Sequence, residues 1–415
     1  MGQIPSHWET RRFRFLLAEN SLQNTDLKER KQLQFKYGNI VPKANQSEDK
    51  DVLDTIKKYT VVAPGDIMIN GLNLNYDFIS QRVAQVQEPG VITSAYVSLR
   101  PLGGANSKYY TYYMKAMDAQ KLFHGMGSGV RLTLSYDNLK NLFFPYPSPE
   151  EQEAIVSYLD AATAKIDEAI AQQQRMINLL NERQRIIIEK AVTKGINVDV
   201  ELIDSGVDYI GTIPSHWETR RLGVLGQFTK GGNISRDDLD DDGPEPAILY
   251  GDIYTKYFVK VTDIKNHISS KTASASVLVT RGDLLMTGSG ETKEDIGKTV
   301  VLLAEKAFIG GDVILFKQTK NDSRYLSYVL NSKYSQDYRY RMSKGEIVVH
   351  IYPYSLKDLR ITLPPVPEQK QIANYLDTRL QAIDNLKQVV LQQIDILQER
   401  KQIIVNDVVT GRVKV

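Results

Sequence analysis

One stretch of the chain comes close to a phosphate-binding loop. Residues 290–299 end in the Gly-Lys-Thr of that motif. The motif also needs a glycine at position 292, where this chain has Thr292, and the backbone amides cradle a phosphate only with that spacing. The stretch therefore does not predict ATP binding.

Other arrangements that could support catalysis are also incomplete. Asp252, Asp263 and Lys265 loosely match the Asp…Asp-x-Lys metal site of nucleases, but such triples arise by chance in a charged chain. The five histidines are dispersed and cysteine is absent, so the sequence predicts no metal site. Neither the Asn/Asp-Pro-Pro-Tyr motif of adenine methyltransferases nor a glycine-rich nucleotide turn is present. We expect a chain that is not an enzyme and binds no cofactor of its own.

The dominant feature of the sequence is an internal duplication. Residues 2–12 return as residues 211–221 with one difference in eleven positions, and the only tryptophans, Trp8 and Trp217, are a matched pair. A second match, offset by 217 residues, includes Glu151-Gln152 with Glu368-Gln369, Tyr158-Leu159-Asp160 with Tyr375-Leu376-Asp377, and Val192-Thr193 with Val409-Thr410. The order is thus a variable segment and a matched segment, repeated once.

The matched segments, 149–194 and 365–415, have the pattern of long helices that begin after a run of prolines. Apolar residues recur every seven positions, which predicts that the two helices form a coiled coil with each other. About 44 residues at 1.5 Å each would give roughly 65 Å of helix. The main seam contains Leu159, Ile166, Gln173, Leu180 and Ile187 in one helix and Leu376, Ile383, Val390, Leu397 and Ile404 in the other.

A second, less regular seam is predicted through Ala162, Ala169 and Met176 and through Ile372, Leu386 and Gln393. Gln173 aligns with Val390 in the repeat, and a polar residue in a seam can set the register of two helices. If the seam assignment holds, Gln173 has that role.

The variable segments, 1–148 and 211–364, contain mixed and strand-rich patterns, and residues 195–210 form a linker before the second one. Both contain a strand, a Gly-Asp turn and another strand, around Gly65-Asp66 and Gly282-Asp283. The repeated Ser-His-Trp-Glu matches a helix capping box, so we expect a short helical turn there that leads into a strand.

Composition permits nucleic-acid binding without requiring it. The net charge is +2 over 415 residues; by segment it is +5 for 1–148, −6 for 149–210 and +2 for 211–364. No apolar run approaches the roughly 18 residues of a membrane span, and the start lacks a signal-peptide pattern. We expect a cytoplasmic protein.

Taken together, the repeated Ile-Pro-Ser-His-Trp-Glu turns, the Glu-Gln helix starts after proline and the Gly-Asp turns resemble the DNA-specificity subunits of Type I restriction-modification systems. The resemblance covers essentially the whole chain. It implies an α+β fold with a pseudo-twofold internal repeat. Two mixed α/β target recognition domains would be separated by two long conserved helices that form an antiparallel coiled coil.

The resemblance also implies a function and partners. Each target recognition domain would read one half of a bipartite, asymmetric sequence in double-stranded DNA. Two modification subunits, adenine-N6 methyltransferases that use S-adenosylmethionine, would bind near the conserved regions. Two restriction subunits, which are translocating nucleases that use ATP and Mg, would complete the complex. The chain itself would supply specificity and no catalysis.

Candidate DNA contacts follow from residue type, because base edges are read by Arg, Lys, Asn, Gln, Ser and Thr on loops, and phosphates by cations and hydroxyls. The loops of the first domain predict contacts from Asn70, Asn73, Asn75, Tyr76, Arg82, Ser94, Tyr96, Ser128 and Arg131. Those of the second predict contacts from Lys230, Asn233, Arg236, Ser289, Thr292, Lys293, Lys298, Lys344 and His350. For any single residue the alternative is an ordinary solvated turn.

Two further stretches are interpreted as lying away from DNA. The tyrosine-rich residues 109–113 are predicted to be the packed face of a domain helix rather than a platform for stacked bases. The acidic run 237–242 would repel phosphate, so we expect it to point away from DNA.

Two rival functions remain open on the sequence alone. A coiled-coil scaffold that binds only proteins would have no basic groove and no salt-dependent affinity for DNA. A nuclease acting alone would cleave DNA with a divalent metal and would depend on Asp252 or Asp263.

Overall fold

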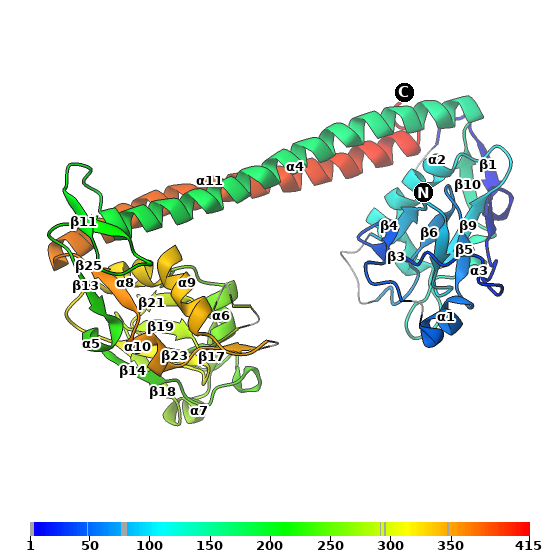
Figure 1. Ribbon diagram of the computed structural model, residues 1–415. Coiled ribbons are helices and arrows are strands. Elements are labelled where there is room, and N and C mark those ends of the chain that lie inside the picture. The colour runs from blue at the N-terminus through cyan, green and yellow to red at the C-terminus, as the bar shows by residue number, and fades with distance from the viewer. Residues whose placement is uncertain (1–3, 48, 76–80, 291, 294–295, 347) are drawn as a thin grey trace. The chain divides into compact units, whose positions relative to one another are not determined.

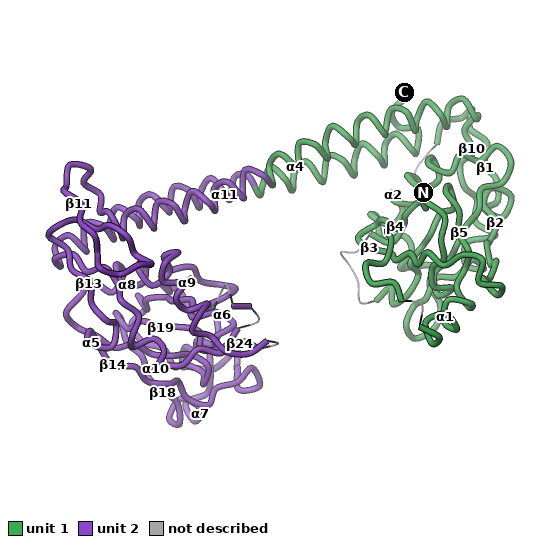
Figure 2. The backbone as a smooth tube through the Cα atoms, viewed as in Figure 1, with its two compact units in different colours: residues 1–174, 391–415 green, residues 175–390 purple. Residues whose placement is uncertain are grey.

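The computed structural model describes residues 4–47, 49–75, 81–290, 292–293, 296–346 and 348–415. The chain divides into two compact units, residues 1–174 with 391–415 (unit 1) and residues 175–390 (unit 2), shown in Figure 2. Each unit contains one variable domain and parts of both long helices. Among the described residues, no helix is long and apolar enough to span a membrane.

Unit 1 is built around a four-stranded antiparallel sheet (Figure 1). Its strand order is β2 (Leu17–Glu19), β9 (Val97–Pro101), β6 (Ile67–Ile69), β7 (Val83–Gln85). Three antiparallel pairs accompany it: β1 (Glu9–Arg12) with β10 (Phe143–Tyr146), β3 (Leu33–Lys36) with β4 (Asn39–Pro42), and β5 (Thr60–Val62) with β8 (Gly90–Ile92). The helices of the domain are η1 (Phe13–Phe15), α1 (Lys50–Ile56), α2 (Ser107–Ala119), η2 (Leu122–Gly125) and α3 (Tyr136–Leu139).

Unit 2 contains two larger sheets. One has the order β14 (Gln227–Lys230), β23 (Val313–Lys317), β19 (Leu284–Thr287), β21 (Thr299–Leu302), β16 (Lys260–Val261), and the other β17 (Asn266–Ile268), β15 (Glu245–Ile248), β22 (Lys306–Ile309), β18 (Val277–Thr280). The strand pairs are β11 (Leu202–Asp204) with β12 (Thr212–Pro214), β13 (Glu218–Arg221) with β25 (Arg360–Leu363), and β20 (Ser289–Gly290) with β24 (Val349–His350). The helices are α5 (Leu222–Leu225), η3 (Arg236–Asp238), α6 (Tyr250–Thr255), α7 (Ser270–Ser274), α8 (Ser323–Leu330), α9 (Lys333–Met342) and α10 (Pro353–Lys357).

The duplication extends into the sheets. The order β2-β9-β6-β7 of unit 1 corresponds to β14-β23-β19-β21 of unit 2. The predicted strand, Gly-Asp turn and strand are confirmed in both, with positive φ at Gly65 (+93°) and Gly282 (+95°). The buried Asp66 accepts a hydrogen bond from the amide of Ala63 at 3.0 Å, and Asp283 accepts one from Thr280 at 2.8 Å.

The two long helices are confirmed as α4 (Pro149–Lys194) and α11 (Val366–Val409), of 46 and 44 residues. They lie side by side and antiparallel (Figure 1). In unit 2 the amide Nε2 of Gln184 donates to Asp384 at 2.8 Å, and Lys387 donates to Asn181 at 3.2 Å. A step forward along α4 therefore matches a step back along α11.

The main seam is buried or half-buried throughout, as predicted, whereas the predicted second seam holds only in part: Ile372 is buried, but Met176, Leu386 and Gln393 are exposed. The residues one position further on, all buried or half-buried, are Thr163, Ile170, Ile177, Gln184 and Ala191 in α4 and Ala373, Leu380, Lys387, Ile394, Lys401 and Val408 in α11. Met176 and Leu386 are instead 48% and 54% exposed. Several true seam residues are polar, and a search for apolar residues passes over them.

Polar side chains make contacts between the two helices that can set the register, and the role of Gln173 stays a prediction. Gln184 is only 5% exposed and bonds both Asp384 and Lys387 of α11, the latter donating at 2.8 Å. In unit 1, Lys401 donates to both carboxylate oxygens of Asp167 at 2.7 Å. These bonds would be broken by a shift of one helix along the other.

The repeated tryptophan turn is a short turn that leads into a strand, as predicted, and among the described residues no helix begins at it. Pro5 to Trp8 form a turn closed by the amide of Trp8 donating to the Pro5 carbonyl at 3.0 Å, and β1 follows directly. The turn instead binds the start of α4, because Glu151 accepts hydrogen bonds from Trp8 at 3.2 Å and pairs with His7 at 2.7 Å. His216 and Glu368 repeat the second contact at 2.8 Å at the start of α11.

The same turns also cover the ends of the helices. Gly411, just after α11, has φ +72°, and a β-carbon there would lie 2.4 Å from Pro5 and 3.0 Å from Trp8. Gly195, just after α4, has φ +74° and would place a β-carbon 3.3 Å from Trp217. Glycine is required at both positions for the left-handed backbone, and at Gly411 also for the close approach. Each tryptophan turn thus joins the start of one helix to the end of the other.

Helix α2 anchors the first domain on α4. Asp160 of α4 accepts hydrogen bonds from Lys108 at 2.7 Å and from the hydroxyl of Tyr112 at 2.9 Å. The fully buried Gln152 accepts the amide of Asn106 at 2.8 Å. Tyrosines 109, 110 and 113 are buried in the same core, which confirms that residues 109–113 form a packed face.

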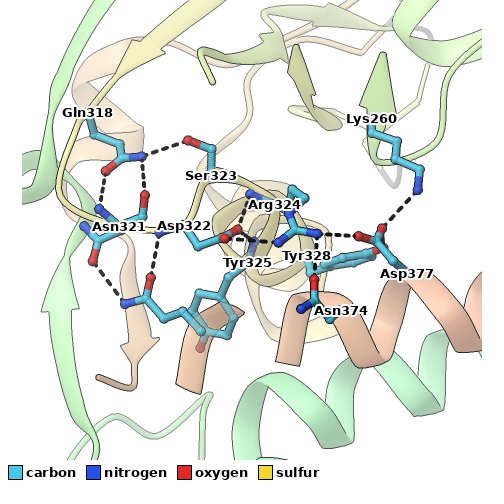
Figure 3. A network of polar contacts seen from close by, with 11 residues as sticks. Lys260, Gln318, Asn321, Asp322, Ser323, Arg324, Tyr325, Tyr328, Asn374 and Asp377 are labelled. Atoms are coloured by element: carbon cyan, nitrogen blue, oxygen red, sulfur yellow. Dashed lines mark hydrogen bonds and ion pairs between the residues drawn. The ribbon is translucent and has the colours of Figure 1, made fainter. Parts of the chain in front are cut away.

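The second domain is anchored on α11 by an equivalent network, shown in Figure 3. Asp377 accepts hydrogen bonds from Lys260 at 3.0 Å, Arg324 at 2.9 Å and the hydroxyl of Tyr328 at 2.8 Å. The buried Gln369 accepts the amide of Asp322 at 2.9 Å, as Gln152 does for Asn106. The sequence Asp-Ser-Arg-Tyr of 322–325 therefore repeats Asn-Ser-Lys-Tyr of 106–109 with the same chemistry.

Replacing Asp377 by alanine should destabilise unit 2. The side chain is 22% exposed and accepts three hydrogen bonds, two of them from cations, so we expect a loss of about 2 kcal/mol or more in the free energy of unfolding. Urea denaturation measures this loss. The matched control is Asp263→Ala, because Asp263 pairs only with Lys265 on the open surface and its removal should leave stability unchanged. Equal midpoints for the two variants would contradict the anchoring role.

Candidate nucleic-acid interface

The predicted DNA-contacting loops converge at one end of each main sheet because neighbouring strands are antiparallel. In unit 1, Ile69 at the end of β6 pairs with Val97 at the start of β9. The loop after β6 and the loop before β9 therefore lie at the same end. In unit 2, Thr287 at the end of β19 pairs with Val313 of β23 in the same way.

In unit 1 the loop 70–75 binds a small hairpin at 128–133. The amide of Leu74 donates to the carbonyl of Leu132 at 3.2 Å, and Leu134 donates to Gly71 at 2.9 Å. Asn75 adds a bond from its side chain to the carbonyl of Val130 at 3.3 Å. The structure thus brings together Asn70, Asn73, Asn75, Ser128 and Arg131, of which Asn73, Ser128 and Arg131 are exposed.

Arg82 does not fit the prediction of a direct contact, because its side chain is only 1% exposed. Its guanidinium donates to the carbonyls of Asn70 at 2.9 Å, Leu72 at 2.8 Å and Asn73 at 3.3 Å. Its amide donates to Asp118 at 2.7 Å, and burial raises the pKa of that carboxyl. Arg82 therefore lies beneath the loop and holds its backbone.

The remaining predicted residues of unit 1 are less closely joined to this surface. Ser94 is exposed in the loop before β9. Tyr96 is half-buried, and its ring packs edge-on against Phe35 with centroids 5.8 Å apart. Tyr76 lies outside the described residues.

In unit 2 the corresponding loops are joined by backbone hydrogen bonds. The amide of Gly288 donates to the carbonyl of Asp312 at 2.7 Å, and Ile351 donates to Gly288 at 2.9 Å. The backbones of Lys344 and His350 bond each other at 2.8 and 2.9 Å. The exposed predicted residues are Lys230, Asn233, Arg236, Thr292 and Lys344, whereas Lys293, Lys298 and His350 are half-buried.

An open groove of about 990 Å³ lies beside these loops, and Asn233, Arg236 and Thr292 contribute to its lining. Asp238 lines the groove as well. Its carboxylate caps the short helix η3 by accepting hydrogen bonds from the amide and the hydroxyl of Ser235, both at 2.8 Å. Asp238 thus lies beside predicted contact residues, and the orientation of the acidic run relative to DNA stays a prediction.

Two predicted residues of unit 2 serve the protein's own structure. Ser289 is 4% exposed, and its hydroxyl bonds Nδ1 of His350 at 2.9 Å. Lys298 donates to the carbonyl of Tyr254 at 3.1 Å.

A row of stacked rings continues from His350 to the surface. The rings of His350 and Tyr352 lie 6.4 Å apart and those of Tyr352 and Tyr354 lie 5.6 Å apart, nearly parallel at 8°. The ammonium groups of Lys230 and Lys344 lie 5.9 and 6.0 Å from the centroids of Tyr352 and Tyr354. These contacts hold two surface cations in place beside the groove loops.

The comparisons with known proteins agree with this duplicated arrangement. The model of the type I restriction modification DNA specificity domain matches the chain twice, over residues 6–178 and 214–395. The chain belongs to this DNA specificity family. The two matches begin at the two tryptophan turns and end within the two long helices, so the family repeat is the repeat seen in the sequence.

Individual relatives are distant but match along most of their length. The type I restriction enzyme MjaVIII specificity subunit of Methanocaldococcus jannaschii is 23% identical, over 86% of this chain and 81% of the relative. The MjaIX specificity subunit of the same organism is 21% identical, over 80% and 75%. A solved structure from work on complex assembly and conformational transition of the type I R-M system covers 100% of both chains with a TM-score of 0.72 and 16% identity, which supports the fold.

The residues that loosely matched a nuclease site and a phosphate-binding loop have structural surroundings that differ from those of such sites. Asp252 is 7% exposed and accepts hydrogen bonds from the amide of Leu249 and the side chain of Asn266, each at 2.8 Å. Within the described residues, no group of three His, Cys, Asp or Glu side chains is placed to hold a metal ion. Thr299 begins strand β21, whereas the threonine of a phosphate-binding loop begins a helix.

Sequence reasoning missed an exposed hairpin tip that lies beside the candidate loops of unit 1. Tyr37 and Gly38 form the tip of the β3–β4 hairpin, with positive φ at both residues, and Tyr37 is 79% exposed. A β-carbon on Gly38 would lie 2.4 Å from the side chain of Gln81, so this tip lies against the end of the loop before β7. The two-residue turn between short alternating strands was the signal available in the sequence.

Lys230 and Lys344 should contact DNA phosphates, since tyrosine rings hold both cations at the surface. Changing each to glutamine should weaken binding to specific and non-specific duplex alike. It should also reduce the dependence of log K on log salt by about 0.9 for each residue. Titration of the full chain with duplex DNA at several salt concentrations measures both effects. Lys271→Gln, on α7, is the control and should leave the slope unchanged.

Proposed function

We propose that this chain selects the DNA target of a Type I restriction-modification complex, with each domain reading one half of a bipartite, asymmetric sequence. The observation that carries the proposal is that the two units share the same framework but differ in their loops. The order of the central sheet strands and the helix anchor agree between the units, whereas the surfaces beside the reading loops differ. Unit 1 presents the β3–β4 hairpin there, and unit 2 presents the groove formed with η3 and α6.

The duplicated surface supports two copies of one partner. Trp8 and Trp217 are buried, so folding alone explains why the repeat retains them. His7 and His216 pair with the helix starts, but Ser6 and Glu9 and their counterparts 215 and 218 are exposed, and an exposed turn does not require their identity in order to fold. An identical partner that docks at both turns does. We infer two modification subunits, adenine-N6 methyltransferases, bound near the two tryptophan turns.

The reaction chemistry is assigned to the partners. The methyltransferases would use S-adenosylmethionine, and two restriction subunits would use ATP and Mg for translocation and cleavage. In this proposal the chain contributes specificity to the complex, and catalysis belongs to the partners. Its place of action would be the cytoplasm, where the DNA is.

The helix pair would set the distance between the two half-sites. A paired helix is stiffer than a flexible linker, and the bonds from Gln184 and Lys401 oppose sliding of one helix along the other. A fixed number of unread base pairs between the half-sites follows from this stiffness.

Mapping N6-methyladenine in host DNA tests the proposal. Co-expression of this chain with its methyltransferase partner should produce methylation at one bipartite motif with a fixed gap, and neither subunit alone should do so. Sequencing at base resolution reveals the motif. A stable complex that adds no methylation would contradict DNA reading.

Exchanging residues 13–148 for those of a relative gives a sharper outcome. One half of the motif should change while the other half and the gap remain, because the helix pair is retained. A change in both halves would contradict the assignment of one half-site to each domain.

A further inference from the structure

The loop between β6 and β7 is held from below by a buried cation. Arg82 directs two of its nitrogens at three backbone carbonyls of that loop: Nη1 donates to Asn70 and Leu72, and Nη2 to Asn73. Asn73 is exposed and has φ +49°, a left-handed conformation that is unfavourable for most side chains. A fixed donor on its carbonyl stabilises this conformation, because rotation of the backbone would break the bond.

A buried arginine also holds the loop between β19 and β21 in unit 2. Arg339 is 3% exposed; its Nε donates to the carbonyl of Ile296 at 2.9 Å and its Nη1 donates to Leu330. Gly297 has φ +73°, and a β-carbon there would lie 2.4 Å from Cδ of Arg339. Burial lowers the pKa of Arg339 to about 10, which still leaves it charged at neutral pH.

The two arginines reach the equivalent loop from different parts of the chain. Arg82 stands directly before β7, whereas Arg339 comes from α9, after the whole sheet is complete. The arginine therefore does not descend from the duplication in the way that the tryptophan turn does. A buried arginine therefore bonds the backbone at one end of the equivalent loop in both domains, at residues 70–73 and at Ile296, although the two arginines have different origins.

We propose that Arg82 and Arg339 are positioning residues that fix the backbone at residues 70–73 of the β6–β7 loop and 296–297 of the β19–β21 loop, so that exposed side chains beside them meet base edges in one geometry. The proposal rests on the proposed function. It adds that sequence discrimination, as distinct from DNA affinity in general, depends on two residues that do not touch DNA.

Arginine suits this role for a geometric reason. Its planar guanidinium presents five N–H donors in a fixed fork, so one side chain can bond several carbonyls at set angles. Lysine carries the same charge on a single nitrogen and cannot reproduce that fork. The substitutions Arg82→Lys and Arg339→Lys therefore keep the charge and remove the geometry.

The test uses the chain in complex with its methyltransferase partner and a duplex carrying the motif found by methylation mapping. Arg82→Lys should lower the affinity for that duplex on the order of tenfold or more, the effect of a mismatched base. Affinity for a scrambled duplex and the salt dependence of binding should not change, since phosphate contacts are untouched. The motif should relax in one half only, and Arg339→Lys should relax the other half.

Hydrogen exchange separates positioning from stability. In Arg82→Lys, amide exchange should accelerate at Leu72 and Leu74, while Met68 of β6 and Leu99 of β9 stay protected. The matched controls are Arg14→Lys, exposed in η1, and Arg341→Lys, exposed two residues after Arg339, and neither should alter the motif.

Three outcomes would overturn the inference: an unchanged motif with unchanged exchange, an equal loss of affinity for both duplexes, or a loss of protection across β6 and β9. The last would make Arg82 a residue of general stability. If the unaltered complex methylates no motif, the proposed function fails first, before any variant is made.

Discussion

The contact between each tryptophan turn and two helix ends is the constraint on which the rest of the structure depends. An amphipathic helix of 46 residues is stable only when its apolar stripe is covered along its length. The partner can cover that stripe only if the ends of the two helices meet. Trp8 bonds Glu151 at the start of α4 and lies against Gly411 after α11. In the second turn, His216 bonds Glu368 at the start of α11 and Trp217 lies against Gly195 after α4.

Helices α2 and α8 connect the variable domains to the two long helices. Asp160 and Asp377 each bind a cation and a tyrosine hydroxyl from the first helix after the sheet. The main sheet is therefore tied to the long helices by the same bonds in both units. The elements between β14 and β18 enlarge the second domain, and one of them, β16, adds Lys260 as a further donor to Asp377.

The repeat, the long helices and the main seam could be predicted because each leaves a periodic trace in the sequence. The second seam could not, since buried positions such as Thr163 and Gln184 are polar and their burial is a tertiary property. The repeat of residues 106–109 at 322–325 was not recognised in the sequence. Asn106 corresponds to Asp322 and Lys108 to Arg324, so the two copies share their chemistry but differ in residue identity. Loop composition identified residues that do lie together, but it could not tell the exposed Arg131 from the buried Arg82.

The hydrogen bonds from Arg82 to the loop backbone have a consequence for how such a protein can evolve. Its acceptors are main-chain carbonyls, which every amino acid supplies. A substitution at Leu72 therefore alters the side chain offered to a partner while the backbone bonds from Arg82 are retained. A lineage can explore new recognition sequences by single replacements in this loop without first rebuilding the core that supports it.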